Sequence, residues 1–428
     1  MREDIKNRIE AVRSGEVPEG YSTERAMLYP NDWGEPVPLN TVLSENKDRN
    51  EDLRFGKDDV LSVSGEQGVV NQIGLLGRSY AGESVAPYHI VETGDVVYTK
   101  SPLKENPYGI IKQNRGVPGI VSTLYAVYHC DSPITGQYIE NYFCIDTYLN
   151  NYLKPLVKRG AKNDMKVNNE EVLLGRIPLP PIQEQERINE IIDQLDQVIE
   201  LKRQLLEEKR RQKQWLMQNL LDPNSGMRLP GFECTKWAET PLASICKFVG
   251  GGTPDTSNEH YWNGTIPWLS SADLQDGNIH SVQPTRFITE EAVKNSATKI
   301  CPKDSILIVS RVGVGKIAIA PVELCTSQDF TNLVDVNGNL YFITLQIQRE
   351  IQRILTMSQG TSIKGIASKE IKAVVINLPS RSEQDAIAKV LECSDREISL
   401  CEKEIKAWQQ KKKALMQLLL TGLVRVNA

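Results

Sequence analysis

Long apolar stretches are missing from this chain. It contains no run of about 18 consecutive apolar residues, so it offers no helix that could cross a membrane. Its first residues, MREDIKNRIE, lack the apolar core that a secretion signal needs. We therefore expect a cytoplasmic protein.

Histidine is scarce and cysteine is scattered. The four histidines stand at positions 89, 129, 260 and 280, and none of the eight cysteines forms a C-x-x-C pair. This distribution argues against a metal site, a disulfide framework and a Ser/His/Asp or Cys/His catalytic group. We expect the cysteines to be buried, reduced thiols.

An excess of basic residues is also absent. The 50 Lys and Arg residues and 55 Asp and Glu residues give a formal net charge of −5, whereas a freestanding nucleic-acid-binding protein usually carries a basic surface. The deficit does not exclude DNA binding, because the charge at a groove matters more than the sum and a partner subunit can supply phosphate contacts. The length of 428 residues is enough for two or three domains.

One long segment occurs twice. Residues 177–221 read IPLPPIQEQERINEIIDQLDQVIELKRQLLEEKRRQKQWLMQNLL, and residues 376–420 read INLPSRSEQDAIAKVLECSDREISLCEKEIKAWQQKKKALMQLLL. A constant shift of 199 positions aligns the copies without a gap, so that Glu184 falls on Glu383. A repeat of this length indicates an internal duplication.

Both copies have the pattern of a long helix. Apolar residues recur at alternating steps of three and four, the coiled-coil period, although Lys202, Lys209 and Lys213 interrupt the first copy. Helices of about 40 residues would extend for roughly 60 Å, too long for the surface of one small domain. We predict an antiparallel coiled coil between the two copies; two separate surface helices are the alternative. The predicted interface consists of Ile188, Ile192, Leu195, Ile199, Leu206, Ile387, Leu391, Ile398, Ile405 and Trp408.

The rest of the chain forms two globular segments of dissimilar sequence. Short β-branched or aromatic runs set off by glycines predict strands, and apolar residues at helical spacing predict helices. The expected strands are 61–65, 68–73, 94–100, 119–130, 306–310 and 316–320, the expected helices are 3–13, 136–154 and 341–357, and 14–30 is expected to be loop.

The fold class that follows is α+β. We expect two mixed α/β domains, separated and joined by the two long helices, in a pseudo-twofold repeat. The predicted boundaries are 1–30 for an N-terminal helix and arm, 31–177 for the first domain, 178–226 for the central helix, 227–376 for the second domain and 377–428 for the C-terminal helix.

Three short motifs resemble catalytic or phosphate-binding sequences but lack essential parts. The segment 106–109, NPYG, lacks the second proline of the N-P-P-[YF] motif of adenine methylases. The segment 313–316, GVGK, has neither the first glycine nor the final Ser or Thr of a phosphate-binding loop. The glycines at 250–252 have no strand–helix context and predict a loop, one able to approach a ligand closely.

Four features in order nevertheless resemble one family. The segment 179–185, LPPIQEQ, is similar to a P-L-P-x-x-E-Q entry into a conserved helix, and 378–384 repeats it, with Ser380 and Arg381 replacing a proline and an apolar residue. The end of the second copy, Leu420-Thr421-Gly422, resembles the exit from that helix. The segments GGTPDTSNEHYWNGTIPWLSSADL, VLSVSGEQGVV, GDVVYTK and GIVSTLY resemble two classes of target-recognition domain. The family is that of the specificity subunits of type I restriction-modification systems.

The resemblance implies a DNA-binding function. Each globular segment would be a target-recognition domain that reads one half of a bipartite, asymmetric site on double-stranded DNA. The paired helices would set the distance between the halves and dock two modification subunits, which would hold S-adenosylmethionine and methylate adenine. Two restriction subunits, where the system has them, would add ATP- and magnesium-dependent translocation and cleavage. The chain itself would bind no cofactor and would not be catalytic.

The chemistry of base recognition limits the candidate DNA-binding residues. Arg and Lys pair with guanine, and Asn and Gln pair with adenine. Ordinary surface charge is the alternative reading of each basic residue. The candidates are Arg78, Lys100, Lys112 and Arg115 in the first domain, and Arg286, Arg311, Lys316 and Lys364 in the second.

Two other functions stay open from the sequence. The first is a coiled-coil adaptor or scaffold with two ligand-binding domains and no DNA binding. The second is a stand-alone methylase, which the incomplete motifs disfavour. Binding of a bipartite DNA site would separate the proposed reader from the adaptor.

Overall fold

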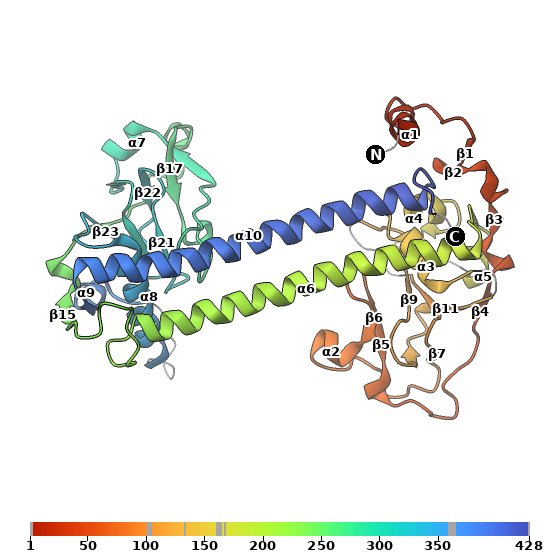
Figure 1. Ribbon diagram of the computed structural model, residues 1–428, viewed down its shortest axis with the longest axis horizontal. Helices are drawn as coiled ribbons and strands as arrows, with labels where there is room; N and C mark the ends of the chain where they lie inside the picture. Colours follow the sequence, from red (N-terminus) through yellow and green to blue (C-terminus); the bar gives the residue numbers. More distant parts are fainter. Residues whose placement is uncertain are drawn as a thin grey trace. The chain divides into compact units, whose positions relative to one another are not determined.

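The computed structural model divides into two compact units, whose elements are labelled in Figure 1. Unit 1 contains residues 1–203 and 403–428, and unit 2 contains residues 204–402. The residues that the structure describes are 3–100, 105–131, 134–159, 165–166, 168–357 and 365–426.

Unit 1 is built on a four-stranded antiparallel sheet. The strand order is β4-β11-β8-β9, and valine, isoleucine and tyrosine fill most positions of its three longer strands, as β-propensity requires. The strands are β4 (Leu43–Glu45), β11 (Tyr125–Cys130), β8 (Val96–Thr99) and β9 (Ile110–Gln113).

Buried tyrosines form much of the core of unit 1. They come from the sheet and from α3 (Gly136–Phe143) and α4 (Asp146–Leu153). A buried hydroxyl needs a hydrogen-bond partner, and that of Tyr152 donates to the carbonyl of Val172, the last residue of α5 (Asn169–Val172). A Cβ at Gly175 would lie 2.3 Å from the Tyr152 ring. Glycine is therefore required where the chain passes this ring.

Smaller β elements complete unit 1. We call one group of them insert 1; its pairs are β5 with β6 and β7 with β10. Insert 1 consists of β5 (Leu61–Ser64), β6 (Gly68–Asn71), α2 (Gln72–Leu76), β7 (His89–Val91) and β10 (Gly119–Val121). The remaining elements are α1 (Glu3–Arg13), the pair β1 (Tyr21–Glu24) and β2 (Met27–Pro30), the pair β3 (Val37–Pro38) and β14 (Arg176–Ile177), and the pair β12 (Lys158–Arg159) and β13 (Met165–Lys166).

Unit 2 repeats the core sheet of unit 1. Its strand order is β16-β23-β20-β21. If the four core strands of each unit are numbered along the sequence, the order across the sheet is 1-4-2-3 in both units. The strands are β16 (Lys247–Gly250), β23 (Phe330–Val334), β20 (Ile306–Val309) and β21 (Ile317–Ile319). The pair β15 (Ala238–Pro241) and β24 (Val375–Leu378) corresponds to β3 and β14, and α8 (Leu340–Met357) and α9 (Ser368–Lys372) correspond to α3 and α5. The duplication therefore extends beyond the helices.

The part of unit 2 that departs from this plan we call insert 2. It is a second four-stranded sheet of order β18-β17-β22-β19, in which β17 and β22 run parallel. Insert 1 has two separate strand pairs instead. Insert 2 consists of β17 (Ile266–Leu269), β18 (Arg286–Ile288), α7 (Glu290–Lys294), β19 (Ile300–Cys301) and β22 (Leu324–Thr326). The two units thus share a core and differ in their inserts.

The long helices α6 (Ile182–Leu220) and α10 (Arg381–Leu420) pack together. In unit 1, Ile188 near the start of α6 belongs to the same core as Leu419 near the end of α10. In unit 2, Leu220 at the end of α6 shares a core with Ile387 near the start of α10. Within each unit the helices therefore run antiparallel. The predicted fold class, two α/β domains with two packed long helices, is confirmed.

The Glu-Gln pair at the start of α6 anchors the helix to unit 1. The buried carboxylate of Glu184 accepts a hydrogen bond from the indole Nε1 of Trp33 at 3.0 Å and pairs with Arg425 at 2.8 Å. Gln185 donates to the carbonyl of Pro180 at 2.9 Å. Because a buried charge is stable only when paired and hydrogen-bonded, these contacts fix the entry into the helix.

The same pair at the start of α10 makes matching contacts in unit 2. The buried carboxylate of Glu383 accepts a hydrogen bond from Nε1 of Trp237 at 3.1 Å and another from Thr235 at 2.6 Å. Gln384 donates to the carbonyl of Pro379 at 3.0 Å. The repeated motif therefore has one structural role, which is to attach each helix to a tryptophan near the start of the domain before it.

Three predicted elements differ from the structure. The run 119–130 is two strands, β10 and β11, because its halves pair with different neighbours, β7 and β8. The predicted helix 136–154 is interrupted between α3 and α4. Part of the expected loop, residues 21–30, is the hairpin β1–β2, whose turn places the non-glycine residues Arg25 and Ala26 at positive φ. That turn carried no glycine signal in the sequence.

The cysteines depart in part from expectation. All eight are free; Cys301, Cys325 and Cys401 are buried, but Cys144, Cys234 and Cys393 are exposed. Burial raises the pKa of the Cys301 thiol to about 12, which keeps it protonated and unreactive. In the described part of the chain, no helix has the length and apolar character needed to cross a bilayer.

Candidate nucleic-acid interface and interhelical contacts

Two of the predicted DNA-binding cations are engaged inside unit 1. Lys112 is buried, with its Nζ 3.7 Å from the carboxylate of Glu140. Arg115 forms ion pairs with Glu140 at 2.8 Å and with Asp193 of α6 at 3.2 Å. These contacts use the charge of both cations within the fold. They bring Lys112 and Arg115 together and connect the sheet to α6.

In unit 2, Lys316 has a structural role as well. Its Nζ donates to the carbonyls of Ser271 and Leu274 at 3.0 and 2.9 Å, which ties the loop after β17 to β21. The segment 313–316 is thus a turn between strands. Lys364 lies outside the described residues.

The glycine loop 250–252 approaches protein backbone. A Cβ on Gly251 would lie 1.9 Å from the carbonyl oxygen of Ser327, and one on Gly252 would lie 2.4 Å from the carbonyl carbon of Ala297. The expected close approach is therefore present, but the neighbours are segments of the same unit.

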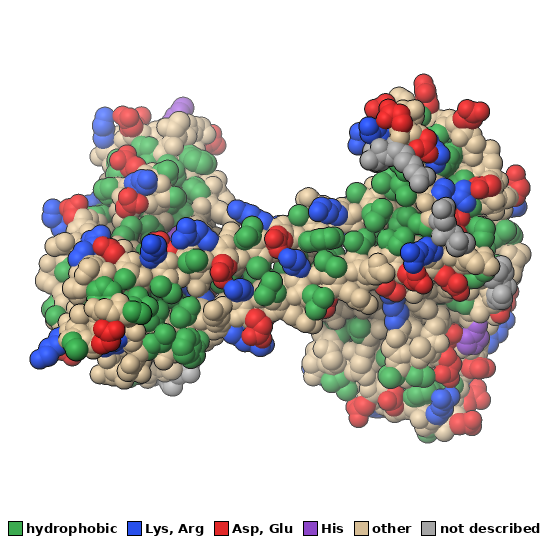
Figure 2. Space-filling model, viewed as in Figure 1, with side chains coloured by type: hydrophobic (Ala, Val, Ile, Leu, Met, Phe, Trp, Pro, Cys, Tyr) green, Lys and Arg blue, Asp and Glu red, His purple; other side chains and the backbone are tan. Residues whose placement is uncertain are grey.

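The remaining candidate cations lie on separate elements nearer the surface. Arg78, Arg286 and Arg311 are exposed, whereas Lys100 is half-buried and burial lowers its pKa. Arg78 stacks on the ring of Tyr80, with its Cζ 4.6 Å from the ring centroid. Arg286 lies over an indole ring at 4.3 Å. Figure 2 shows that, on the visible face of both units, Lys and Arg side chains are interspersed with Asp and Glu.

Charge pairs connect the two long helices within each unit. The three lysines that interrupt the apolar pattern of α6 each meet an acid of α10, so their charges are matched between the helices. The pairs are Lys202 with Glu404 at 2.6 Å in unit 1, and Lys209 with Glu397 at 2.8 Å and Lys213 with Asp395 in unit 2.

One of these ion pairs is itself duplicated. Asp196 with Lys412 in unit 1 and Asp395 with Lys213 in unit 2 are related residue for residue by the shift of 199. The unit 2 pair is more enclosed: the side chain of Asp395 is 21% exposed, against 48% for Asp196. We expect the enclosed copy to contribute more to stability.

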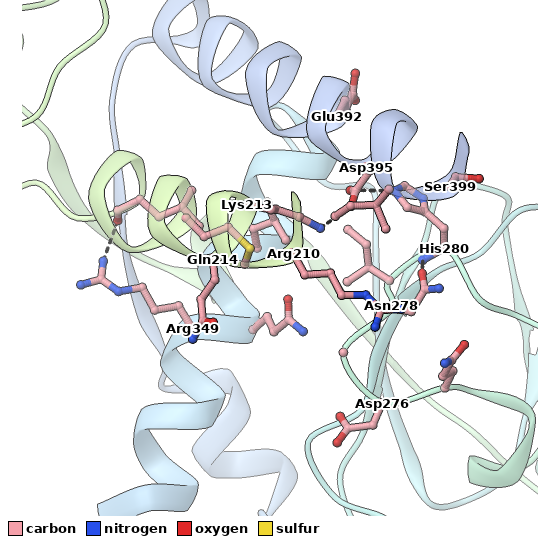
Figure 3. Close-up of a pocket in the computed structure, with 18 of the residues that line it drawn as sticks. Arg210, Lys213, Gln214, Asp276, Asn278, His280, Arg349, Glu392, Asp395 and Ser399 are labelled. Atoms are coloured by element: carbon pink, nitrogen blue, oxygen red, sulfur yellow. Dashed lines mark hydrogen bonds and ion pairs between the residues drawn. The ribbon is translucent and has the colours of Figure 1, made fainter. Parts of the chain in front are cut away.

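Asp395 is the centre of a small polar network, and Figure 3 shows its contacts with Lys213 and His280. It accepts hydrogen bonds from Lys213 and Tyr341, and Nε2 of His280 lies 3.6 Å away. Burial acts to raise the pKa of Asp395, but the contact with His280, the hydrogen bonds from Lys213 and Tyr341 and the charge of Lys213 outweigh it and lower the pKa to about 2. The carboxylate therefore stays charged near neutral pH.

Each unit has a cavity beside its helix pair. The unit 2 cavity has a volume of about 1310 Å³ and the unit 1 cavity about 760 Å³. Three of the cations that line the larger one, Arg210, Lys213 and Arg349, are paired with acids, and a fourth, Arg396, donates to the backbone carbonyl of Glu392. Met217 and Met416, which are equivalent in the repeat, line the two cavities.

The residues predicted for the helix interface are all at least partly shielded from solvent. Leu195, Ile398 and Trp408 are half-buried. The buried members are Ile188, Ile192, Ile199, Leu206, Ile387, Leu391 and Ile405.

Sequence reasoning missed two exposed leucines on the same helices. Leu201 is 64% exposed and Leu400 is 58% exposed. They are equivalent in the repeat, being 199 positions apart, and that shift could have identified them as an outward-facing apolar position kept in both copies.

Two globular units that share a core sheet but differ in their inserts, each joined to the same pair of helices, define a duplicated recognition scaffold. A family model described as type I restriction modification DNA specificity domain matches residues 126–209 and 235–408. The chain therefore belongs to this family, as its resemblance to specificity subunits indicated.

Two curated relatives from Methanocaldococcus jannaschii illustrate the likeness. The putative type I restriction enzyme MjaX specificity subunit is 24% identical over 96% of both chains. The MjaIX specificity subunit is 34% identical over 37% of this chain, and the match spans only 38% of that relative.

Solved structures support the fold. A chain from work on complex assembly and conformational transition of the type I R-M system is 19% identical, with a TM-score of 0.59 over 96% of this chain and 100% of that one. The specificity subunit of M. genitalium is 13% identical, with a TM-score of 0.51 over 90% of this chain and 95% of that one.

The network around Asp395 gives a pH-dependent prediction. Because the pKa of this carboxyl is lowered from 3.8 to about 2, its charge stabilises the fold above pH ~4 and the contribution is lost as the pH falls toward 2. Asp395→Asn should cost about 2 kcal/mol of unfolding free energy at pH 7 and about half of that at pH 3. Urea denaturation followed by tryptophan fluorescence measures both values.

The duplicated pair supplies the control for this prediction. Asp196→Asn removes the equivalent, more exposed ion pair and should cost less than about 1 kcal/mol. Equal costs for the two variants, or a cost of Asp395→Asn that does not change with pH, would contradict the assignment.

Proposed function

We propose that this chain is the DNA sequence-specificity subunit of a type I restriction-modification complex and is not catalytic by itself. Each globular domain, 31–177 and 227–376, reads one half of a bipartite, asymmetric site on double-stranded DNA. The observation that carries this proposal is the combination of a repeated core sheet with two unrelated inserts. Two readers of different sequences need a common frame and different contact surfaces.

The paired helices act as the spacer of this reader. Two half-sites read from one side of B-DNA lie about one helical turn, ~34 Å, apart. Helices of 39 and 40 residues have the length for such a separation at about 1.5 Å per residue. The DNA between the half-sites would then be contacted through its backbone alone.

The helices also dock two modification subunits. Leu201 and Leu400 are exposed at equivalent positions, and an apolar side chain kept outward in both copies suits a partner that binds twice. These subunits would hold S-adenosylmethionine and methylate adenine. Restriction subunits, where the system encodes them, would bring ATP and magnesium to the complex.

The two-reader proposal predicts modular specificity. Replacing residues 227–376 by the corresponding segment of a relative should change one half of the selected DNA sequence and leave the other half intact. The measurement is selection of bound sequences from a random duplex library by the assembled complex. A change in both halves would refute the two-reader assignment, and failure of the unmodified complex to select any bipartite sequence would favour the adaptor function.

Lengthening the helices should lengthen the spacer. The change is an insertion of seven residues between Arg203 and Gln204 and of seven between Glu402 and Lys403. These insertions keep the apolar pattern in phase. Both partners of each described ion pair between the helices stay on the same side of the insertion points. The insertion adds about 10 Å, so the half-sites should move apart by about three base pairs at ~3.4 Å each. The rotation of roughly 100° that accompanies them should weaken binding.

Selection from a library of spacer lengths tests this prediction. Two-residue insertions at the same places are the control, because at about 3.6 residues per turn they rotate the apolar pattern by roughly 200° and should disrupt pairing rather than shift the spacer. An unchanged optimal spacer in the seven-residue variant, with both half-sites still bound tightly, would mean that something other than the helices sets the distance.

The docking proposal predicts how many modification subunits bind to each chain. Leu201→Glu or Leu400→Glu alone should reduce the modification subunits bound per chain from two to one, and the double variant should bind none, because a charge at an apolar contact is costly to desolvate. Sedimentation or native mass spectrometry of the purified complex gives the count. Two subunits retained on the double variant would exclude these leucines as the contact.

A further inference from the structure

The two units differ in their inserts, and this difference limits where sequence-determining residues can lie. The core sheets have the same strand order in both units. The residues that give the two domains different sequence preferences are therefore expected first in inserts 1 and 2. Of the eight candidate cations, Arg286 stands at the start of β18, one of the two edge strands of insert 2.

Arg286 rests on two tryptophan rings. It pairs across the sheet with Trp268 of β17, and its Cζ lies 4.3 Å from that ring centroid and 5.7 Å from the ring of Trp262. The two rings meet edge to face, with centroids 5.1 Å apart. A guanidinium over an indole face is held by cation–π attraction and stacking. The side chain is therefore partly ordered before any ligand arrives.

Hydrogen bonds fix both rings of this platform. Nε1 of Trp268 donates to the carbonyl of Gly252 at 2.9 Å, and Nε1 of Trp262 donates to the carbonyl of Asp255 at 3.1 Å. The close packing of Gly252 against Ala297 keeps the first carbonyl in place. By contrast, Arg78 of unit 1 stacks on Tyr80, whose ring is largely exposed. Arg286 is the better oriented of the two stacked arginines.

The guanidinium of Arg286 has no hydrogen-bond partner in the described part of the chain. Among the described residues its side chain forms no hydrogen bond or ion pair, and this side chain is exposed. Its five N–H donors are thus available. Lys316 and Arg115, in contrast, donate to carbonyls and carboxylates of the protein. A cation held in one orientation with free donors is suited to directional recognition.

A buried acid adds electrostatic attraction on the cation. Burial acts to raise the pKa of Asp273, but hydrogen bonds from Thr285 and Ser270 and the charge of Arg286 lower it, so the carboxylate stays ionised. No ion pair forms between Asp273 and Arg286 among the described contacts, so the acid attracts the guanidinium without using its donors.

We propose that Arg286 is a specificity-determining residue of the second domain and that its guanidinium reads the edge of one guanine in that domain's half-site. This inference rests on the proposed DNA-reading function and deepens it. A planar guanidinium donates two parallel hydrogen bonds to O6 and N7 of guanine in the major groove. A side chain already held on fixed indoles loses less conformational freedom on binding than a free one.

Selection of DNA by the full-length chain, assembled with its modification subunits, tests the inference. The wild-type complex defines the bipartite sequence. Arg286→Ala should relax the preference at one G·C pair of the half-site assigned to residues 227–376 by roughly 10-fold or more, while the other half-site keeps its sequence. Arg286→Lys should relax the same position but retain affinity and salt dependence, because it keeps the charge and loses the planar pair of donors.

A matched control separates base reading from charge. Lys294→Ala removes an exposed cation from α7 of the same insert and should leave the selected sequence unchanged. The inference is overturned if Arg286→Ala keeps the full sequence preference, or if it weakens binding equally at all sequences, as loss of a phosphate contact would. Thermal melting monitors folding, and if Arg286→Ala does not fold, the result with Arg286→Lys decides.

The outcomes also distinguish this inference from the function on which it rests. If the wild-type complex selects no bipartite sequence, the proposed function fails and the role of Arg286 fails with it. If the wild type selects such a sequence and both Arg286 variants select it unchanged, the proposed function stands and only the role of Arg286 is rejected.

Discussion

The buried glutamate at the start of each long helix is the interaction on which the rest of the structure depends. Glu184 and Glu383 are buried away from solvent, so the charge of each needs hydrogen-bond donors from the protein. Trp33 and Trp237 supply them from near the start of each domain. One contact therefore joins the beginning of a globular segment to the beginning of the helix that follows it. The same device occurs twice and gives both domains the same attachment.

The duplication distinguishes the features that the shared core and helices require from the features that vary in the inserts. Features retained in both copies include the Glu-Gln anchors, the Asp–Lys pair between helices and the order of the core strands. Features that differ lie in the inserts. The internal repeat thus acts as a comparison of two related domains within one chain. It indicates that packing requirements preserved the frame while the inserts were free to acquire different contacts.

The long helices could be predicted from the sequence because their apolar period extends over many turns. The lysines at 202, 209 and 213 looked like defects in that pattern, and only the acids opposite them explain their presence. The turn at Arg25 and Ala26 was missed because no glycine marks its positive φ. The division of 119–130 into two strands depends on long-range pairing, which local propensity does not encode.

The sequence predicted which types of residue could bind DNA, but it did not predict which of these cations the fold leaves available. Sequence alone gives Lys112, Arg115, Arg286 and Lys316 equal standing, because all are cations in the globular segments. Three of them are used by the fold: Glu140, Asp193 and backbone carbonyls occupy their donors. Whether a cation is available depends on which acids and carbonyls the tertiary fold brings within about 3 Å. Only the structure supplies that information.

The charge balance of the chain agrees with this division into cations that the fold engages and cations that remain available. In the helices, much of the basic charge is matched by acids of the opposite helix, so a net charge of −5 does not measure what a groove can present. Nonspecific attraction to DNA grows with the number of phosphate contacts, whereas sequence discrimination needs only a few well-oriented donors. A subunit that relies on partners for phosphate contacts can therefore be acidic as a whole and still select a sequence. What it needs is a small number of side chains held as Arg286 is held, on a rigid surface and with free donors.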